Sequence, residues 1–211
     1  MAMRSSTTIG LAVLLLAGVT TLGFGLTPWP HSNAAVPPEL RAVMRPEPRP
    51  LAPFHVVDHH GRPYGLERLE GKWSFVFFGY TYCPDICPAT LSTLAFVFKR
   101  LERTAGDAAD IQSLFVSVDP ERDTPQLLAD YVGYFHDEFT AATGGPGDIE
   151  DLARQFGAGY MREAGKEGDD YLISHTSSIF LVDPQQRLVA AFAPPHDPAT
   201  IATQFTRIRD L

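Results

Sequence analysis

The sequence predicts an α/β domain that follows an N-terminal apolar segment. Continuous apolar runs typical of buried strands occupy residues 73–79 and 111–118, and between them apolar residues recur at helical spacing over 88–103. A strand, a helix and a strand in this order form a βαβ unit, which crosses over in the right-handed sense. The rest of the chain continues to alternate strands with helices, so an α/β fold accounts for the whole domain.

Local signals predict the other elements in chain order. A turn signature at Gly61-Arg62-Pro63 indicates a hairpin over residues 54–69. Asp123-Thr124-Pro125 opens a helix through about His136, and Asp148 starts another that ends near Gly157. Strands are expected at 158–163, 171–173, 178–182 and 187–192, with the last hairpin turn at 183–186 and a closing helix over 198–210.

The N-terminal segment is expected to be a membrane anchor. Residues 9–26 carry no charge and are just long enough to span a bilayer. Arg4 precedes them, so residues 1–8 should stay in the cytoplasm and the domain should lie on the periplasmic side of the inner membrane. A cleaved signal peptide is the alternative, because Ser32-Asn33-Ala34 resembles a cleavage site. Proline-rich residues 27–50 are expected to be a semi-rigid linker, which leaves residues 51–211 as the folded domain.

Composition and charge narrow the class of protein. The chain has 211 residues, of which 45% are hydrophobic, and this suits one core of about 150 residues. A net charge of −8 argues against a nucleic-acid partner, because basic surface is lacking. The acidic balance could favour a cation or a basic partner, but ordinary solubility explains it equally well.

The two cysteines of the chain, Cys83 and Cys87, lie between the strand at 73–79 and the helix that follows it. Pro88 disfavours helical geometry at Cys87 and suits the first helical position. Cys87 is therefore expected to be the N-cap residue, where the helix dipole favours its thiolate.

Three kinds of chemistry fit two thiols with three residues between them. A structural disulfide is one, but closing so small a ring contributes only about 2 kcal/mol, against about 4.7 for a loop of a hundred residues. A reversible disulfide for dithiol redox chemistry is the second. The third is a metal clip, in which two soft sulfur donors select an ion such as Cu(I) and need a further ligand.

His175 is the histidine whose setting best suits that further ligand. The segment 171–178 leads into a strong strand, so a loop there can bring an imidazole to the end of another strand. The other histidines have ordinary explanations as residues of turns, helix ends, a strand or the segment after the apolar run: His31, His55, His59, His60, His136 and His196.

Four segments together resemble the Sco/SenC family: FGYTYCPDICP at 78–88, VDPERDTP at 118–125, HT at 175–176 and LVDP at 181–184. The resemblance covers roughly residues 50–210 and implies a thioredoxin-like, membrane-anchored copper protein that helps assemble the dinuclear copper centre of cytochrome c oxidase. It implies that Cys83, Cys87 and His175 bind Cu(I) or Cu(II). The chain departs from the family at Tyr82, where histidine is common, and at Ser174, where aspartate is common.

Two functions remain open on this basis. The first is a metallochaperone, not an enzyme, that passes copper to the copper-bearing subunit of cytochrome c oxidase, with another copper chaperone as a candidate source of the ion. The second is a membrane-tethered thiol-disulfide reductase that keeps the copper-ligand cysteines of its target reduced and uses Cys83 and Cys87 without a metal. His175 discriminates between them, because a metal site requires it and a simple reductase does not.

Several neighbours are expected to have supporting or local roles. Asp119 should start a turn, and Asp123 or Thr124 should cap a helix, so neither aspartate is expected to be a ligand. Tyr80 and Tyr82 either shield the copper edge or pack around the strand end. The single methionines Met44 and Met161 are expected to be packing residues.

Overall fold

The structure, a computed structural model, describes residues 36–211 apart from 106–108 and 164–170. The expected anchor at 9–26, the expected cytoplasmic residues 1–8 and the first part of the expected linker lie outside the described residues. Within the described ranges, no helix is long and apolar enough to cross a membrane. Residues Val36–Leu211 belong to one compact unit.

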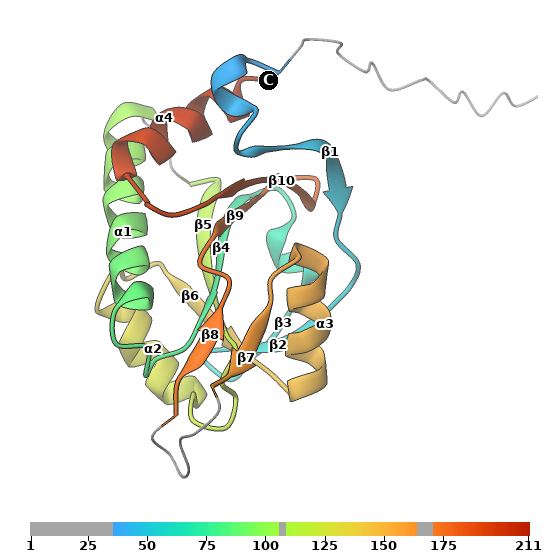
Figure 1. The fold of residues 1–211 in the computed structure, drawn as a ribbon, viewed down its shortest axis with the longest axis vertical. Coiled ribbons are helices and arrows are strands. Elements are labelled where there is room, and N and C mark those ends of the chain that lie inside the picture. Colours follow the sequence, from blue (N-terminus) through green and yellow to red (C-terminus); the bar gives the residue numbers. More distant parts are fainter. Residues whose placement is uncertain (1–35, 106–108, 164–170) are drawn as a thin grey trace, which may run out of the picture. The chain divides into compact units, whose positions relative to one another are not determined.

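A mixed sheet of eight strands forms the centre of this unit (Figure 1). Its strands, in spatial order, are β1 (Met44–Pro50), β10 (Arg187–Phe192), β9 (Ile179–Val182), β4 (Trp73–Gly79), β5 (Ile111–Ser117), β6 (Thr140–Thr143), β2 (His55–Asp58) and β3 (Pro63–Gly65). Strands β4, β5 and β6 are parallel, and every other pairing is antiparallel. A separate hairpin consists of β7 (Tyr160–Arg162) and β8 (Ile173–His175).

Helices cover both faces of the sheet. They are η1 (Pro38–Leu40), η2 (Leu66–Leu69), α1 (Ile86–Ala105), α2 (Pro125–Gly133), α3 (Pro146–Phe156) and α4 (Pro198–Arg209). Figure 1 shows α1 and α4 on one side of the sheet and α3 on the other.

Aromatic side chains of β4 fill the space between the sheet and these helices. Phe75 contacts Phe98 of α1 and Phe205 of α4, with ring centroids 5.8 and 5.2 Å apart. Phe78 points to the other face and contacts Phe156 of α3 at 5.3 Å. Because β4 is buried on both faces, its sequence is a continuous apolar run instead of an alternating one.

The structure confirms the central βαβ unit, and it differs from expectation at the edges. Residues 44–50 are not a linker but edge strand β1, which pairs with β10. An edge strand tolerates prolines because part of its backbone needs no partner. Strand β6, with the small residues of Thr140–Thr143, carries little apolar signal and was not predicted. His175 lies at the end of β8 and not on a loop after a strand over 171–173.

Candidate metal centre

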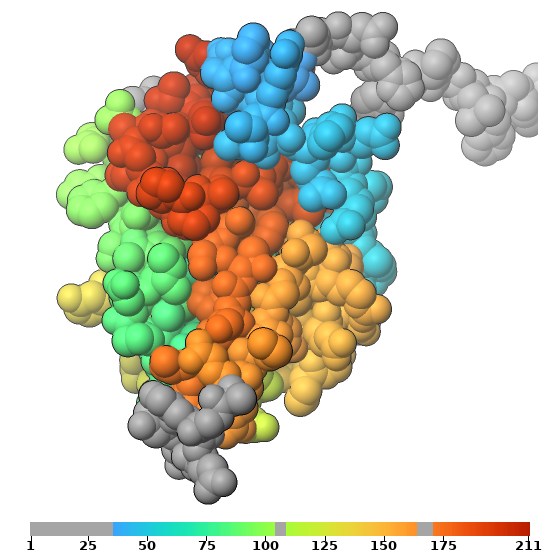
Figure 2. All heavy atoms as spheres, viewed as in Figure 1, coloured from blue at the N-terminus to red at the C-terminus, as the bar shows by residue number. Residues whose placement is uncertain are grey.

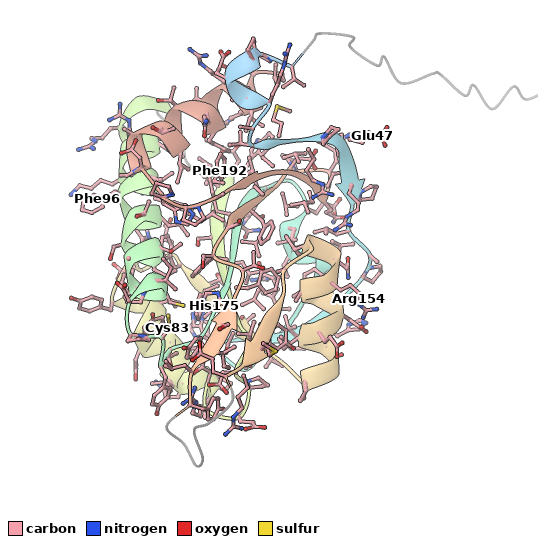
Figure 3. All side chains as sticks on the ribbon, viewed as in Figure 1. Glu47, Cys83, Phe96, Arg154, His175 and Phe192 are labelled. Carbon is pink, nitrogen blue, oxygen red and sulfur yellow. The ribbon has the colours of Figure 1, made fainter. Side chains whose placement is uncertain are left out.

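Three elements bring Cys83, Cys87 and His175 together. Cys83 lies on the loop after β4, Cys87 in the first turn of α1, and His175 at the end of β8. Figure 3 shows Cys83 and His175 side by side near one end of α1. The two sulfur atoms and the nearest imidazole nitrogen all lie within 4.8 Å of one another. Both cysteines are buried, and His175 is half-buried.

The cysteine loop folds so that Cys83, and not Cys87, accepts hydrogen bonds from the helix start. Helix α1 begins at Ile86, which places Cys87 inside the first turn, so the expectation that Cys87 is the N-cap is wrong. The N–H group of Cys87 instead donates to the Cys83 sulfur at 3.4 Å. First-turn N–H groups have no partner within their own helix, and the Cys83 sulfur satisfies one of them.

These contacts give the two thiols opposite acidities. The Cys87 thiol donates to the Cys83 sulfur, and backbone N–H groups at the helix start donate to it as well, so the pKa of Cys83 falls well below its usual value despite burial. The same hydrogen bond, together with full burial, raises the pKa of Cys87. The expectation of a thiolate at Cys87 is therefore corrected: these contacts favour the thiolate at Cys83 and disfavour it at Cys87.

The imidazole of His175 is oriented by its own backbone neighbour. Its Nδ1 lies 3.1 Å from the carbonyl oxygen of Thr176, and a carbonyl can only accept, so Nδ1 carries the hydrogen. Its Nε2 lies 3.3 Å from the Cys87 sulfur. The hydroxyl of Ser174 donates to Glu163 instead. A carbonyl partner at Nδ1 is a common way to fix a ligating histidine, so the serine at 174 leaves the imidazole oriented.

Gly79 allows the helix start to approach the end of β4. A Cβ atom at this position would lie 2.7 Å from the Cys87 sulfur and 2.8 Å from a ring carbon of Phe115. Both distances are shorter than real Cβ contacts, so any side chain here would displace Cys87 or Phe115. Gly79 is a functional residue that was not predicted, although a glycine between an apolar strand and the cysteine loop is a signal of close packing.

Aromatic rings surround the imidazole on its inner side. Phe77 and Tyr80 each meet the His175 ring edge-on, with centroids 5.9 Å apart. Tyr80 is buried, whereas Tyr82 is 56% exposed with the Arg122 guanidinium 4.6 Å from its ring centre. Of the two tyrosines, Tyr80 therefore packs at the site, and Tyr82 lies on the surface beside it.

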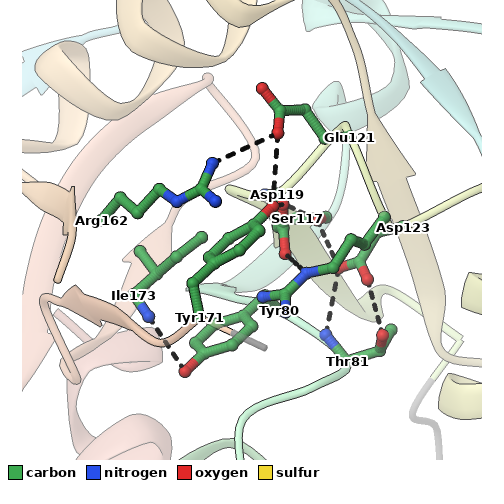
Figure 4. Close-up of polar contacts among 10 residues, drawn as sticks. Tyr80, Thr81, Ser117, Asp119, Glu121, Asp123, Arg162, Tyr171 and Ile173 are labelled. Atoms are coloured by element: carbon green, nitrogen blue, oxygen red, sulfur yellow. Dashed lines mark hydrogen bonds and ion pairs between the residues drawn. The ribbon is translucent and has the colours of Figure 1, made fainter. Parts of the chain in front are cut away.

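Asp123 does more than the local role predicted for it. Its carboxylate accepts from the N–H of Thr81 at 3.0 Å, from the Thr81 hydroxyl at 2.6 Å and from the Ser117 hydroxyl at 2.5 Å (Figure 4). The cap of α2 is Thr124, which accepts from the N–H of Leu127. Burial raises the pKa of Asp123. This carboxyl group ties the cysteine loop to the end of β5.

The other candidate residues lie away from the three donors. Within the described part of the chain, no further group of three or more His, Cys, Asp or Glu side chains has metal-binding spacing. His59 contacts the backbone of Ala141, His196 the backbone of Phe192, and His136 lies 3.7 Å from Glu102. His31 is outside the described residues. Met44 packs against the core as expected, whereas Met161 is 69% exposed.

Comparison with known sequences identifies one family. A sequence model of the SCO1/SenC family matches residues 43–210. The chain is 37% identical to the mitochondrial SCO1 homolog 1 of Arabidopsis thaliana over 145 residues, which cover 69% of this chain and 42% of that protein. It is 34% identical to a SCO2-like protein of Rickettsia prowazekii, over 66% of this chain and 67% of that protein. The chain thus spans less than half of the Arabidopsis protein and about two thirds of the rickettsial one.

Solved structures share the fold. The crystal structure of Arabidopsis thaliana ScoI with copper bound has 34% sequence identity and a TM-score of 0.71, covering 76% of this chain and 98% of that one. Yeast Sco1 with copper bound has 30% identity and a TM-score of 0.71, covering 77% and 90%. These similarities confirm the α/β, thioredoxin-like fold predicted from the sequence.

Proposed function

This chain belongs to the SCO1/SenC family, and on that premise we propose that it is a copper metallochaperone for cytochrome c oxidase. It holds Cu(I) or Cu(II) through Cys83, Cys87 and His175 and delivers the ion to the dinuclear copper centre of the oxidase. The observation that carries the proposal is the convergence of these three donors within 4.8 Å. The copper-bound structures of the Arabidopsis and yeast relatives support it.

The chemistry of the donors fits copper. The two thiolates are soft ligands that select Cu(I), and imidazole is a nitrogen ligand that also suits copper. The lowered pKa of Cys83 and the raised pKa of Cys87 mean that binding of the ion has to release chiefly the proton of Cys87. Cys87 is fully buried, whereas Cys83 keeps a small exposed fraction and His175 is half-buried, so a partner's ligand can enter from the side of Cys83 and His175.

The location and partners belong to the same proposal. Residues 9–26 anchor the chain in the inner membrane as a single span, with residues 1–8 in the cytoplasm and the domain in the periplasm. The partner that receives copper is the copper-bearing subunit of the oxidase, and a second copper chaperone is the source. The uncharged apolar run and the single early cation Arg4 support this orientation.

A thiol-disulfide reductase is the second candidate, and the unequal thiols favour it. The Cys83 thiolate would attack one sulfur of a target disulfide, whose other sulfur leaves as a thiolate. Cys87 would then attack the Cys83 sulfur, releasing the reduced target and leaving a Cys83–Cys87 disulfide. A low-pKa cysteine next to a buried partner suits these two steps.

Titration of the reduced full chain with Cu(I) under anaerobic conditions tests the copper site. We expect one copper per chain and no binding in the Cys83→Ser, Cys87→Ser double variant. In His175→Ala the affinity should fall by at least the roughly 10 to 100-fold that is typical when only an outer-shell partner of a metal ligand is lost. His55→Ala is the control, because His55 is exposed on β2. Unchanged affinity in His175→Ala would show that the imidazole is not a ligand.

Oxidase activity in cells separates the two candidates. The chaperone requires His175, so His175→Ala cells should lose assembled oxidase together with copper binding. The reductase requires only the cysteines, so the same cells should retain oxidase activity. Normal oxidase assembly despite lost copper binding would exclude copper delivery as the function.

A further inference from the structure

The hairpin that carries His175 is separate from the main sheet. Strands β7 and β8 pair with each other, with Tyr160 opposite His175 and Arg162 opposite Ile173. Cys83 and Cys87 are held by β4 and α1, which belong to the body of the domain. The distance between the imidazole and the sulfurs therefore depends on contacts that hold β8 against the cysteine loop.

Tyr80 provides one such contact. Its hydroxyl accepts a hydrogen bond from the N–H of Ile173 at 3.1 Å, and its ring meets the His175 ring edge-on. Tyr80 is buried and lies three residues before Cys83, to whose N–H its carbonyl oxygen is bonded at 3.3 Å. The cysteine loop and β8 thus share a residue that touches both.

Tyr171 provides the second contact, two residues before Ile173. Its hydroxyl donates to Asp119 at 2.5 Å, and the guanidinium carbons of Arg122 and Arg162 each lie 3.5 Å from its ring centre (Figure 4). Asp119 is 2% exposed and also pairs with Arg122 at 2.6 Å. A buried carboxylate is costly unless it is paired and hydrogen-bonded, so Asp119 strongly favours the position in which Tyr171 reaches it.

The contacts of Asp119 lead back to the cysteine loop. Its N–H donates to the Ser117 hydroxyl at 3.1 Å, and that hydroxyl donates to Asp123. Asp123 in turn accepts from both the N–H and the hydroxyl of Thr81, which follows Tyr80. These contacts therefore form a closed network that starts at Tyr80 and returns to Thr81. The network joins the ends of β4, β5 and β8.

We propose that Tyr171 is a positioning residue for His175. Its bond to Asp119 and its place between two guanidinium groups fix the register and depth of β8, so that Nε2 stays beside the cysteine sulfurs. A slip of one residue in β8 would turn His175 to the opposite face of the hairpin. The inference rests on the proposed role of His175 as a copper ligand.

The test uses Tyr171→Phe in the full chain, which keeps the ring and removes the hydroxyl. In the copper-free protein, hydrogen exchange followed by mass spectrometry should be at least about 10-fold faster over residues 171–176 and unchanged over β5. Cu(I) affinity should fall by about 10-fold, the lower end of the range for outer-shell partners. A purely structural role would instead accelerate exchange throughout the domain.

Tyr64→Phe is the matched control. Tyr64 is also buried, but its hydroxyl has no hydrogen-bond partner among the residues that the structure describes, and it lies on β3 at the far edge of the sheet. If Tyr171→Phe matches Tyr64→Phe in both local exchange and copper affinity, the proposal is wrong.

Arg162→Gln decides the question if Tyr171→Phe does not fold. Its guanidinium covers Tyr171 from a partly exposed site on β7, so the fold should tolerate its loss. We expect faster exchange over 171–176 and a smaller loss of copper affinity, and wild-type values for both would overturn the proposal. Unchanged copper binding in His175→Ala would overturn the ligand assignment alone, because exchange in the copper-free protein reports on the position of β8 without the metal.

Discussion

Cys83 and Cys87 have the same side chain but different chemistry, because they face different atoms. The Cys83 sulfur accepts hydrogen bonds from a backbone N–H group at the helix start and from the Cys87 thiol. Cys87 is fully buried, and its thiol acts as a hydrogen-bond donor. The sequence predicted a thiolate stabilised by the helix dipole. It predicted this thiolate at Cys87, because Pro88 suits the first position of the helix. The helix begins earlier, at Ile86, so the earlier cysteine accepts the hydrogen bonds.

Alkylation at pH 6 should distinguish the two residues. The contacts lower the pKa of Cys83 to about 4, so its reactive thiolate is present at pH 6 and is lost only as the pH falls through about 4.

The same shift makes stability depend on pH. In the unfolded chain both thiols have a pKa of about 8.5, so the ionised Cys83 contributes its full stabilisation of the fold above pH 8.5. This contribution declines as the pH falls from 8.5 to about 4.

Iodoacetamide labelling followed by peptide mass spectrometry is the measurement. We expect modification of Cys83 in the folded, reduced, metal-free chain at pH 6 and little modification of either cysteine in urea at the same pH. Labelling of Cys87 ahead of Cys83 would contradict the assignment of the thiolate.

At the scale of elements, the site depends on how closely α1 approaches β4. Gly79→Ala should lower the free energy of unfolding by about 1–3 kcal/mol, the usual cost of overpacking, because the added Cβ meets the Cys87 sulfur at 2.7 Å. Copper affinity should fall as well, since Cys87 is displaced. Gly147→Ala on α3 is the control, because its added Cβ meets nothing within 4 Å. Urea unfolding curves of both variants measure the effect, and equal stability would contradict it.

The elements that the sequence predicted well are those with a strong local signal. Strand β4 is a continuous apolar run, and α4 begins after Asp197, whose side chain accepts from the N–H of Thr200 at 2.7 Å as a capping residue does. Strand β1 was missed because its proline-rich sequence becomes a strand only through pairing with β10, which lies far along the chain.

The same distinction applies to the candidate site. The motif around the cysteines and His175 suggested the three donors through its resemblance to a family. The contact between Tyr171 and Asp119 joins residues 52 positions apart, and neither residue type signals it locally. Sequence reasoning therefore found the donors but not the contacts that hold them in place.

At the scale of the whole molecule, residues 36–50 are part of the domain. Leu40 of η1 is fully buried, and Glu39 beside it forms an ion pair with Arg207 of α4. Figure 2 shows this N-terminal segment, in blue, lying against α4, in red. Strand β1 continues from it and covers the edge of β10.

A fragment of residues 51–211 should consequently be less stable than one of residues 36–211. Burial of a leucine side chain contributes about 1.5–3 kcal/mol, so the loss of Leu40 alone should lower the melting temperature by at least about 3 °C. The shorter fragment also exposes the edge of β10, which favours aggregation. Copper affinity should be the same in both fragments, because Cys83 and His175 lie in the lower half of the domain in Figure 3, whereas η1 lies at its top. Thermal unfolding followed by circular dichroism, together with Cu(I) titration, tests both parts, and equal melting temperatures would show that β1 and η1 add no stability to the domain.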